Sequence, residues 1–117
     1  MTDKELTSEQ ILELATEALS DLKGDKISVL NVKQHTDMME FMVVCTGTSK
    51  RHVHALGQNV ITHLKNHGLQ ALGSEGKGSE NDWVLVDLYD VVVHVMTDEA
   101  RTFYDLEKLW DITSDNI

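Results

Sequence analysis

The sequence is poor in the residues that mark disulfide-stabilised, secreted and membrane-spanning proteins. It has a single cysteine, Cys45, so no disulfide can form within the chain, which fits a reducing compartment. The apolar runs are too short to cross a bilayer, and the N-terminal "MTDKELTSEQ" contains no apolar signal core. Aromatic residues make up only 5% of the chain, so aliphatic side chains must form most of the core. We therefore expect a cytoplasmic protein without a membrane partner.

Basic residues are also scarce, since 10 Lys and Arg stand against 20 Asp and Glu and give a formal charge of −10. Such a chain is repelled by nucleic-acid phosphates and is attracted to a basic partner. No RRM or KH signature is present, so we expect no direct nucleic-acid specificity. The 117 residues, 41% of them apolar, are expected to form one domain over 1–117 with a tail that frays from about residue 111.

Hydrophobic periodicity predicts elements in the order α-β-β-α-β-β-β-α, and hence an α/β fold with one mixed five-stranded sheet flanked by helices. The first helix is expected to be capped by Thr7 or Ser8, to carry Leu22 on its apolar stripe and to end at Gly24. The second helix is expected over 49–67, and the strands over 26–32, 40–46, 69–73, 83–88 and 91–96. Residues 73–82 are expected to be a loop. A last helix, capped by Thr97 or Asp98, has an apolar face of Phe103, Leu106 and Trp110.

A small polar turn joins the second strand to the second helix, and it consists of Gly47, Thr48, Ser49, Lys50 and Arg51. The N–H groups at a helix start, together with the two adjacent bases, could hold an anion. Alternatively, Thr48 or Ser49 caps the helix and the glycine relieves the turn. The G-x-x-x-x-G-K-[ST] spacing of a P-loop is absent.

The same turn suggests an alternative function, that of an enzyme with residual nucleotide-binding or nucleotidyltransferase activity. Nucleotidyltransferases place a Gly-Ser turn at such a junction and need a carboxylate pair about a dozen residues later to hold two Mg²⁺ ions. The corresponding window here, "GQNVITHLK" over 57–65, contains no Asp or Glu. The metal ligands of that chemistry are therefore missing.

Six histidines raise the question of a metal site. His63 and His67 are four residues apart on the second predicted helix, and His52 lies on the same helix, but no Cys, Asp or Glu beside them completes a site. His94 alternates with valines in a strand and is expected to be structural. No G-x-S-x-G elbow supports a nucleophilic serine. We predict no metal, no cofactor and no catalytic residue.

Trp83 opens a strand directly after a flexible acidic loop. Strand alternation places Trp83, Leu85 and Asp87 on one face of the sheet, and Val84, Val86 and Leu88 on the other. An edge tryptophan beside acids is typical of an anchor for a partner protein. Packing of the tryptophan under the terminal helix, against Phe103 or Trp110, is the alternative.

Several segments in the right order carry a family resemblance. They are "DLKG" (21–24), "CTGTSKRHV" (45–53), "EG" (75–76), "WVLVDL" (83–88), "DVVVHVM" (90–96) and "FYDLEKLW" (103–110). Over about residues 12–110 the chain resembles the ribosomal silencing factor family, also called Iojap or RsfS. The resemblance implies a nucleotidyltransferase-like fold without catalytic carboxylates. It also implies a translational repressor that binds the large ribosomal subunit through a basic protein, large-subunit ribosomal protein fourteen, and blocks joining with the small subunit, mainly in starvation or stationary phase. A role in large-subunit maturation is implied as well.

By the same resemblance, the contact surface for the ribosomal protein involves Trp83, Asp87, Leu88, Tyr89 and Asp90. Members of the family form dimers, so a homodimer is a further expectation. One departure concerns the hairpin turn, where the family usually has glycine and this chain has Tyr89. A glycine there suggests a positive φ, which tyrosine adopts only at a cost.

Overall fold

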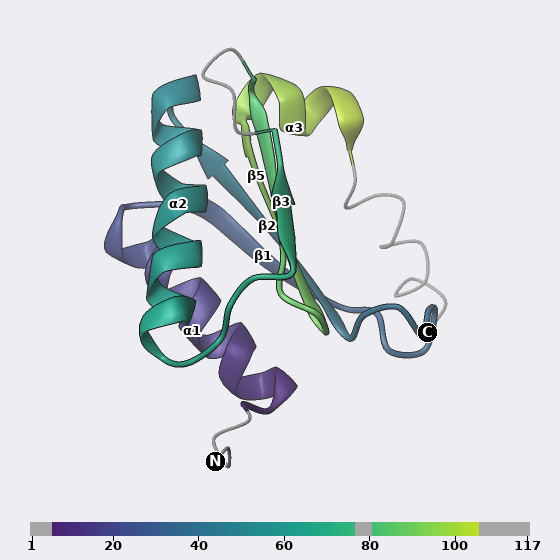
Figure 1. Cartoon of the computed structure of the whole chain (residues 1–117). Helices are drawn as coiled ribbons and strands as arrows, with labels where there is room; N and C mark the ends of the chain where they lie inside the picture. Colours follow the sequence, from purple (N-terminus) through teal and green to yellow (C-terminus); the bar gives the residue numbers. More distant parts are fainter. Residues whose placement is uncertain (1–5, 77–80, 106–117) are drawn as a thin grey trace.

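The computed structural model describes residues 6–76 and 81–105 and confirms the expected α/β class (Figure 1). The helices are α1 (Ser8–Asp21), α2 (Lys50–Asn66) and α3 (Asp98–Tyr104), and the strands are β1 (Asp25–Asn31), β2 (Phe41–Gly47), β3 (Gly73–Glu75), β4 (Trp83–Asp87) and β5 (Val91–Thr97). The strands form one sheet in the order β1-β2-β5-β4-β3. β2 and β5 run parallel, and the other neighbouring strands run antiparallel. The sheet is therefore mixed, as predicted.

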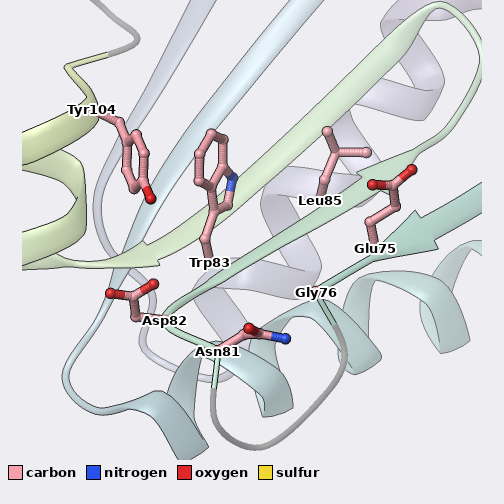
Figure 2. Close-up of a pocket in the computed structure, with 7 residues that line it drawn as sticks. All are labelled: Glu75, Gly76, Asn81, Asp82, Trp83, Leu85 and Tyr104. Atoms are coloured by element: carbon pink, nitrogen blue, oxygen red, sulfur yellow. The ribbon is translucent and has the colours of Figure 1, made fainter.

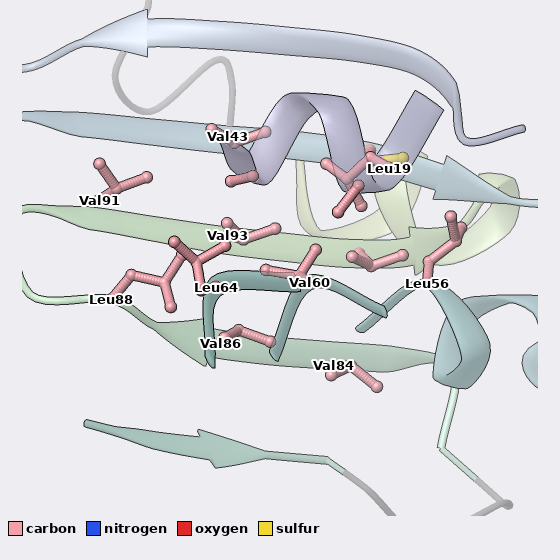
Figure 3. Close-up of a cluster of buried hydrophobic side chains, with 14 of the residues drawn as sticks. Leu19, Val43, Leu56, Val60, Leu64, Val84, Val86, Leu88, Val91 and Val93 are labelled. Carbon is pink, nitrogen blue, oxygen red and sulfur yellow. The ribbon is translucent and has the colours of Figure 1, made fainter. Parts of the chain in front are cut away.

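The main core lies between the sheet and the two long helices, which cover the same face (Figure 1). Valines of the three central strands point toward leucines of α1 and α2, as Figure 3 shows for Val43, Val93, Leu19 and Leu64. All four of these side chains are fully buried. Aliphatic β-branched residues suit a pleated surface, and leucines suit the helices that pack on it, so the sequence pattern and the layers agree.

Local capping explains where α1 begins and ends. The Thr7 hydroxyl accepts a hydrogen bond from the Gln10 N–H while the Gln10 side chain accepts one from the Thr7 N–H, which is a capping box. At the other end Lys23, and not Gly24, takes the left-handed conformation, with φ +62°. The prediction that Leu22 belongs to the buried stripe is wrong, because its side chain is 38% exposed at the end of the helix.

The opposite face of the sheet is covered differently. The short helix α3 packs there near one end, where Ala100 joins a smaller buried cluster with Met42, Val44 and Met96. Thr97 caps α3 by accepting from the Ala100 N–H, as expected. Phe103, which was expected on the apolar face of this helix, is 79% exposed. Leu106, Trp110 and the tail over 111–117 lie outside the described residues.

One predicted strand is displaced. The strand expected over 69–73 lies instead at Gly73–Glu75, inside the segment expected to be a loop. Its three residues pair antiparallel with β4, so Glu75 lies opposite Leu85. This edge strand is too short for a period-two pattern to be visible in the sequence, which is why composition alone favoured a loop.

Candidate functional site

The helix-poor face of the sheet is the candidate site, because β4 presents alternate side chains to it. Trp83, Leu85 and Asp87 are partly exposed, whereas Val84 and Val86 are buried in the main core. This confirms the alternation predicted from the sequence. Two hollows lie on this face. They are the Trp83 pocket, lined by Glu75, Gly76, Asn81, Asp82, Trp83, Leu85 and Tyr104, and the Tyr89 groove, lined by Met38, Met39, Leu72, Asp87, Tyr89, Asp90 and Val92.

In the Trp83 pocket, a cavity of about 340 Å³, the indole is held from two sides (Figure 2). Its Nε1–H donates to Nδ1 of His94 over 3.0 Å, and its ring lies 4.5 Å from the Tyr104 ring, centroid to centroid, at 49°. The tryptophan therefore does pack against the terminal helix, but through Tyr104 and not through Phe103. It also contacts the smaller buried cluster, and it keeps some exposed surface toward the pocket.

His94 is the buried partner of this tryptophan, with 6% of its surface exposed. Burial lowers its pKa from 6.5 to about 4, because a charged imidazolium would lose its hydration. The ring is therefore neutral near pH 7, with Nδ1 as the acceptor and the proton on Nε2. The prediction of a satisfied structural histidine is confirmed.

The Tyr89 groove, of about 400 Å³, surrounds the turn between β4 and β5. Tyr89 is 46% exposed and has φ +75°, so the turn keeps the left-handed geometry that the family's usual glycine suggests. The Tyr89 N–H donates to Oδ1 of Asp87 over 3.0 Å, which supports the strained residue. Side chains from two other loops complete the groove. Met38 is 84% exposed and Leu72 is 61% exposed.

The other residues expected in the partner surface have different positions. The Leu88 side chain is fully buried in the main core, so it can support the turn but cannot offer a side-chain contact at the surface. Asp90 is exposed, and its carboxylate accepts from the Ser8 hydroxyl over 3.2 Å. Its backbone carbonyl accepts from the N–H groups of Glu40 and Phe41, which ties the turn to the start of β2.

Sequence reasoning missed Met38, Met39 and Leu72. Met38 and Met39 could have been noticed as two apolar residues in an otherwise polar loop. Leu72 was included in the strand predicted over 69–73 and was therefore not considered as a surface residue. The position of Leu72 is fixed by its N–H, which donates to the Asp87 carbonyl over 2.9 Å.

The turn before α2 is explained by capping and close packing. The Ser49 hydroxyl accepts from the His52 N–H, and the Thr48 N–H donates to Nδ1 of His52 over 2.9 Å. Nε2 of His52 lies 2.7 Å from the Leu22 carbonyl, so the ring joins the turn to the end of α1. A Cβ at Gly47 would lie 2.8 Å from the Val53 side chain, so this glycine permits close contact between strand and helix.

Internal bonds thus use N–H groups that an anion would need. Lys50 and Arg51 are exposed side chains beside this turn. In the window that would carry nucleotidyltransferase carboxylates, Nδ2 of Asn59 donates to the Ala18 carbonyl over 2.8 Å and joins the two long helices. The candidate metal histidines are likewise in structural contacts. Nε2 of His63 lies 2.9 Å from a Glu17 carboxylate oxygen, and Nδ1 of His67 lies 3.0 Å from the His63 carbonyl oxygen.

In the described part of the chain, no group of three or more His, Cys, Asp or Glu side chains is arranged to hold a metal ion. The thiol of Cys45 is buried, and burial raises its pKa to about 11, so it remains a protonated thiol near pH 7. No helix within residues 6–76 and 81–105 has the length and apolar character that a membrane crossing needs.

The sequence is similar to that of several known proteins. A family model described as "Ribosomal silencing factor during starvation" matches residues 5–116. A ribosomal silencing factor of Chromobacterium violaceum is 47% identical over 102 residues, which cover 87% of this chain and 83% of that protein. A mouse protein named "Mitochondrial assembly of ribosomal large subunit protein 1" is 36% identical over 91 residues, 75% of this chain and 40% of that protein.

A solved structure agrees with these matches. A crystal structure of a protein from Chromobacterium violaceum is 46% identical and superposes with a TM-score of 0.87, over 90% of this chain and 87% of that one. The names of the silencing-factor relatives describe a regulatory role and indicate no catalytic activity. The match over almost the whole sequence, together with the shared fold, shows that the chain belongs to the ribosomal silencing factor family.

Proposed function

We propose that this protein acts in the cytoplasm as a translational repressor that binds the large ribosomal subunit and blocks joining with the small subunit. Its contact is a basic ribosomal protein, large-subunit ribosomal protein fourteen by the family resemblance, and it acts mainly in starvation or stationary phase. The mechanism requires occupancy of a surface and no chemistry. Membership of the ribosomal silencing factor family supports a ribosome-associated role.

The Tyr89 groove is the observation that carries the choice of surface. Three large, strongly exposed apolar side chains, Met38, Leu72 and Tyr89, come from three separate loops and gather there. Grouped apolar residues with polar neighbours mark interaction sites, whereas scattered ones do not. Asp87 and Asp90 supply the polar rim, and basic residues of a partner can pair with them.

Net charge supports the same kind of partner. A chain with a formal charge of −10 is steered toward a basic protein, and rim charges of this kind affect the association rate and its salt dependence more than the affinity. We expect association to slow as the salt concentration rises, because exposed charges are screened beyond about 10 Å at 0.1 M ionic strength.

The mouse relative named for assembly of the large ribosomal subunit favours a second role, in late maturation of that subunit. The same surface serves both roles, because each needs the protein to remain on the large subunit. Cells that lack the protein should accumulate large-subunit precursors, and a groove variant that cannot bind should fail to restore maturation.

Co-sedimentation with purified large subunits tests the binding step. Leu72→Ser removes an apolar contact from the groove, and Leu22→Ser makes the same exchange at the end of α1, where Leu22 is also exposed. We expect Leu72→Ser to weaken binding roughly tenfold, as loss of a central interface contact does. Leu22→Ser should bind like the unaltered chain.

Equal binding by both variants would contradict the assignment of the groove. An unaltered chain that stays at the top of the gradient would contradict the proposed function itself. A calorimetric titration with a magnesium nucleotide would then test the enzymatic alternative at the Gly47 turn. The homodimer remains a prediction, and light scattering of the free protein would measure its mass.

A further inference from the structure

The Trp83 pocket carries a more specific inference, which concerns the kind of side chain that it receives. Its cavity of about 340 Å³ is at the small end of the range of ligand pockets, which is roughly 300–1,000 Å³, so it suits one long side chain better than a folded segment. It lies on the same strand as the Tyr89 groove, because β4 contributes Trp83 and Leu85 to the pocket and Asp87 to the groove. One partner can therefore reach both hollows.

The walls of the pocket are held in place before any partner arrives. Gly76 has φ +80°, and a Cβ on it would overlap the Trp83 carbonyl, so only glycine allows the chain to pass this close to β4. This explains the "EG" pair of the sequence and places Glu75 opposite Leu85. On the other side, the Asp82 carbonyl accepts from the Thr97 N–H over 3.0 Å, which extends the contact between β4 and β5.

The indole offers its ring and not its N–H to the pocket, because His94 already accepts that proton. Figure 2 shows Tyr104 beside one side of the Trp83 ring system, and Leu85 and Glu75 on the other side. The Tyr104 ring lies against the indole at 49°, and the His94 ring also contacts it, with the two centroids 5.6 Å apart. A ligand can therefore reach only the part of the indole that lines the pocket together with Leu85 and Glu75. A ligand there meets an aromatic surface and a carboxylate together.

Charge decides the class of that ligand. Among the described residues that line the pocket, Glu75 and Asp82 carry carboxylates and none carries a base. An anion would be repelled, and a purely apolar side chain would take these carboxylates partly out of water without pairing them. A guanidinium stacks on an indole and can donate two parallel hydrogen bonds to one carboxylate, which a lysine ammonium cannot do.

We propose that the Trp83 pocket receives an arginine side chain of the partner protein, with its guanidinium against the part of the Trp83 indole that lines the pocket and paired with Glu75. Asp82 also lines the pocket and adds to its negative potential. The inference rests on the proposed function for the identity of the partner, but the chemistry of the pocket can be tested without a ribosome.

The first test titrates the ¹⁵N-labelled protein with N-acetyl-arginine methylamide and follows the indole N–H signals by NMR. The Trp83 signal is assigned from the Trp83→Phe variant. The matched probe is N-acetyl-citrulline methylamide, which has nearly the same shape and no charge. We expect saturable shifts of the Trp83 signal and of the Glu75 and Leu85 amides with the arginine probe, and no comparable shifts with citrulline.

Glu75→Gln tests the carboxylate, and Glu13→Gln is its control, since Glu13 is an exposed acid on α1, across the sheet. We expect Glu75→Gln to weaken binding of the arginine probe roughly fivefold, the factor expected for an exposed ion pair, and Glu13→Gln to leave it unchanged. Equal shifts with the two probes, or no shift at Trp83 with either, would overturn the inference.

The second test repeats co-sedimentation with large subunits for the same two variants. Weaker binding by Glu75→Gln than by Glu13→Gln supports the pocket as part of the interface. Equal binding by the two variants, with the unaltered chain bound, would overturn this inference and leave the proposed function intact. If the unaltered chain bound no subunit, the proposed function would fail, and the probe titration would still decide what the pocket binds.

Discussion

The two faces of β4 differ in what their side chains contact, although their residues alternate along one strand. Val84 and Val86 are buried against α2 and the central strands. Trp83 and Leu85, on the other face, line a pocket with acidic neighbours. The covered face determines stability, because its apolar surface is removed from water on folding. The other face retains partly exposed aromatic and acidic groups, which the proposed function assigns to contact with a partner.

The largest effect should come from the covered face. Leu64 is a fully buried residue of α2 in the main core, so Leu64→Ala loses apolar burial and leaves a cavity. We expect its free energy of unfolding to fall by roughly 2–5 kcal/mol. Urea denaturation measures this quantity. A loss below about 1 kcal/mol would contradict the distinction between the two faces.

The free energy of unfolding should change nearly as much with pH, because His94 is buried on the other face of the sheet. The pKa of His94 is about 4 in the folded chain and 6.5 when exposed, so the unfolded state binds the proton more readily between these values. The stability from neutral His94 is fully present above pH 6.5 and is lost as pH falls toward 4. The loss is at most about 3 kcal/mol.

His94→Asn separates this contribution from that of the acids, because the amide oxygen can accept the Trp83 N–H but does not titrate. We expect the free energy of unfolding of this variant to change less between pH 6.5 and 4 than that of the unaltered chain. The same pH dependence in both proteins would show that His94 is not the group responsible.

A smaller effect of opposite sign is expected at the turn. Tyr89 has φ +75°, which costs a non-glycine residue about 1 kcal/mol or more. Tyr89→Gly should therefore raise the free energy of unfolding by about 1 kcal/mol and weaken binding to the large subunit, because an exposed aromatic contact is lost. Thermal unfolding and co-sedimentation measure the two quantities. If stability decreased while binding stayed the same, the residue would serve the fold and not the interface.

The smallest effect on stability should occur in the groove. Leu72 is 61% exposed, so Leu72→Ser should change the free energy of unfolding by less than about 0.5 kcal/mol. Its effect on subunit binding should nevertheless be large. Circular dichroism melts of Leu72→Ser and Leu22→Ser would measure the first quantity, and a clear loss of stability specific to Leu72→Ser would mean that weaker binding reflects folding.

The sequence predicts the structure well where hydrophobic periodicity is strong. It predicts the structure poorly where loops that are distant in the sequence meet. Capping by Thr7, Ser49 and Thr97 and the alternation along β4 follow from local rules, and the structure confirms them. The predicted hairpin already places Leu85 opposite His94, so Trp83 and His94 could have been recognised as diagonal neighbours.

The Tyr89 groove could not be predicted in the same way. Met38 and Leu72 reach Tyr89 only because β2 lies beside β5 and β3 beside β4 in the sheet. No local pattern encodes that strand order. Leu88 shows the opposite case. Strand alternation placed it with Val84 and Val86, the family resemblance placed it in the contact surface, and the structure places its side chain in the core.

Subunit joining is the measurement that tests the central claim most directly. Purified large subunits would be incubated with the unaltered chain, Leu72→Ser or Leu22→Ser, and small subunits would then be added while light scattering reports joining. The account predicts that the unaltered chain and Leu22→Ser suppress the rise in scattering, and that Leu72→Ser suppresses it only at a roughly tenfold higher concentration. A full rise in scattering with the unaltered chain bound to the large subunit would contradict silencing by steric block.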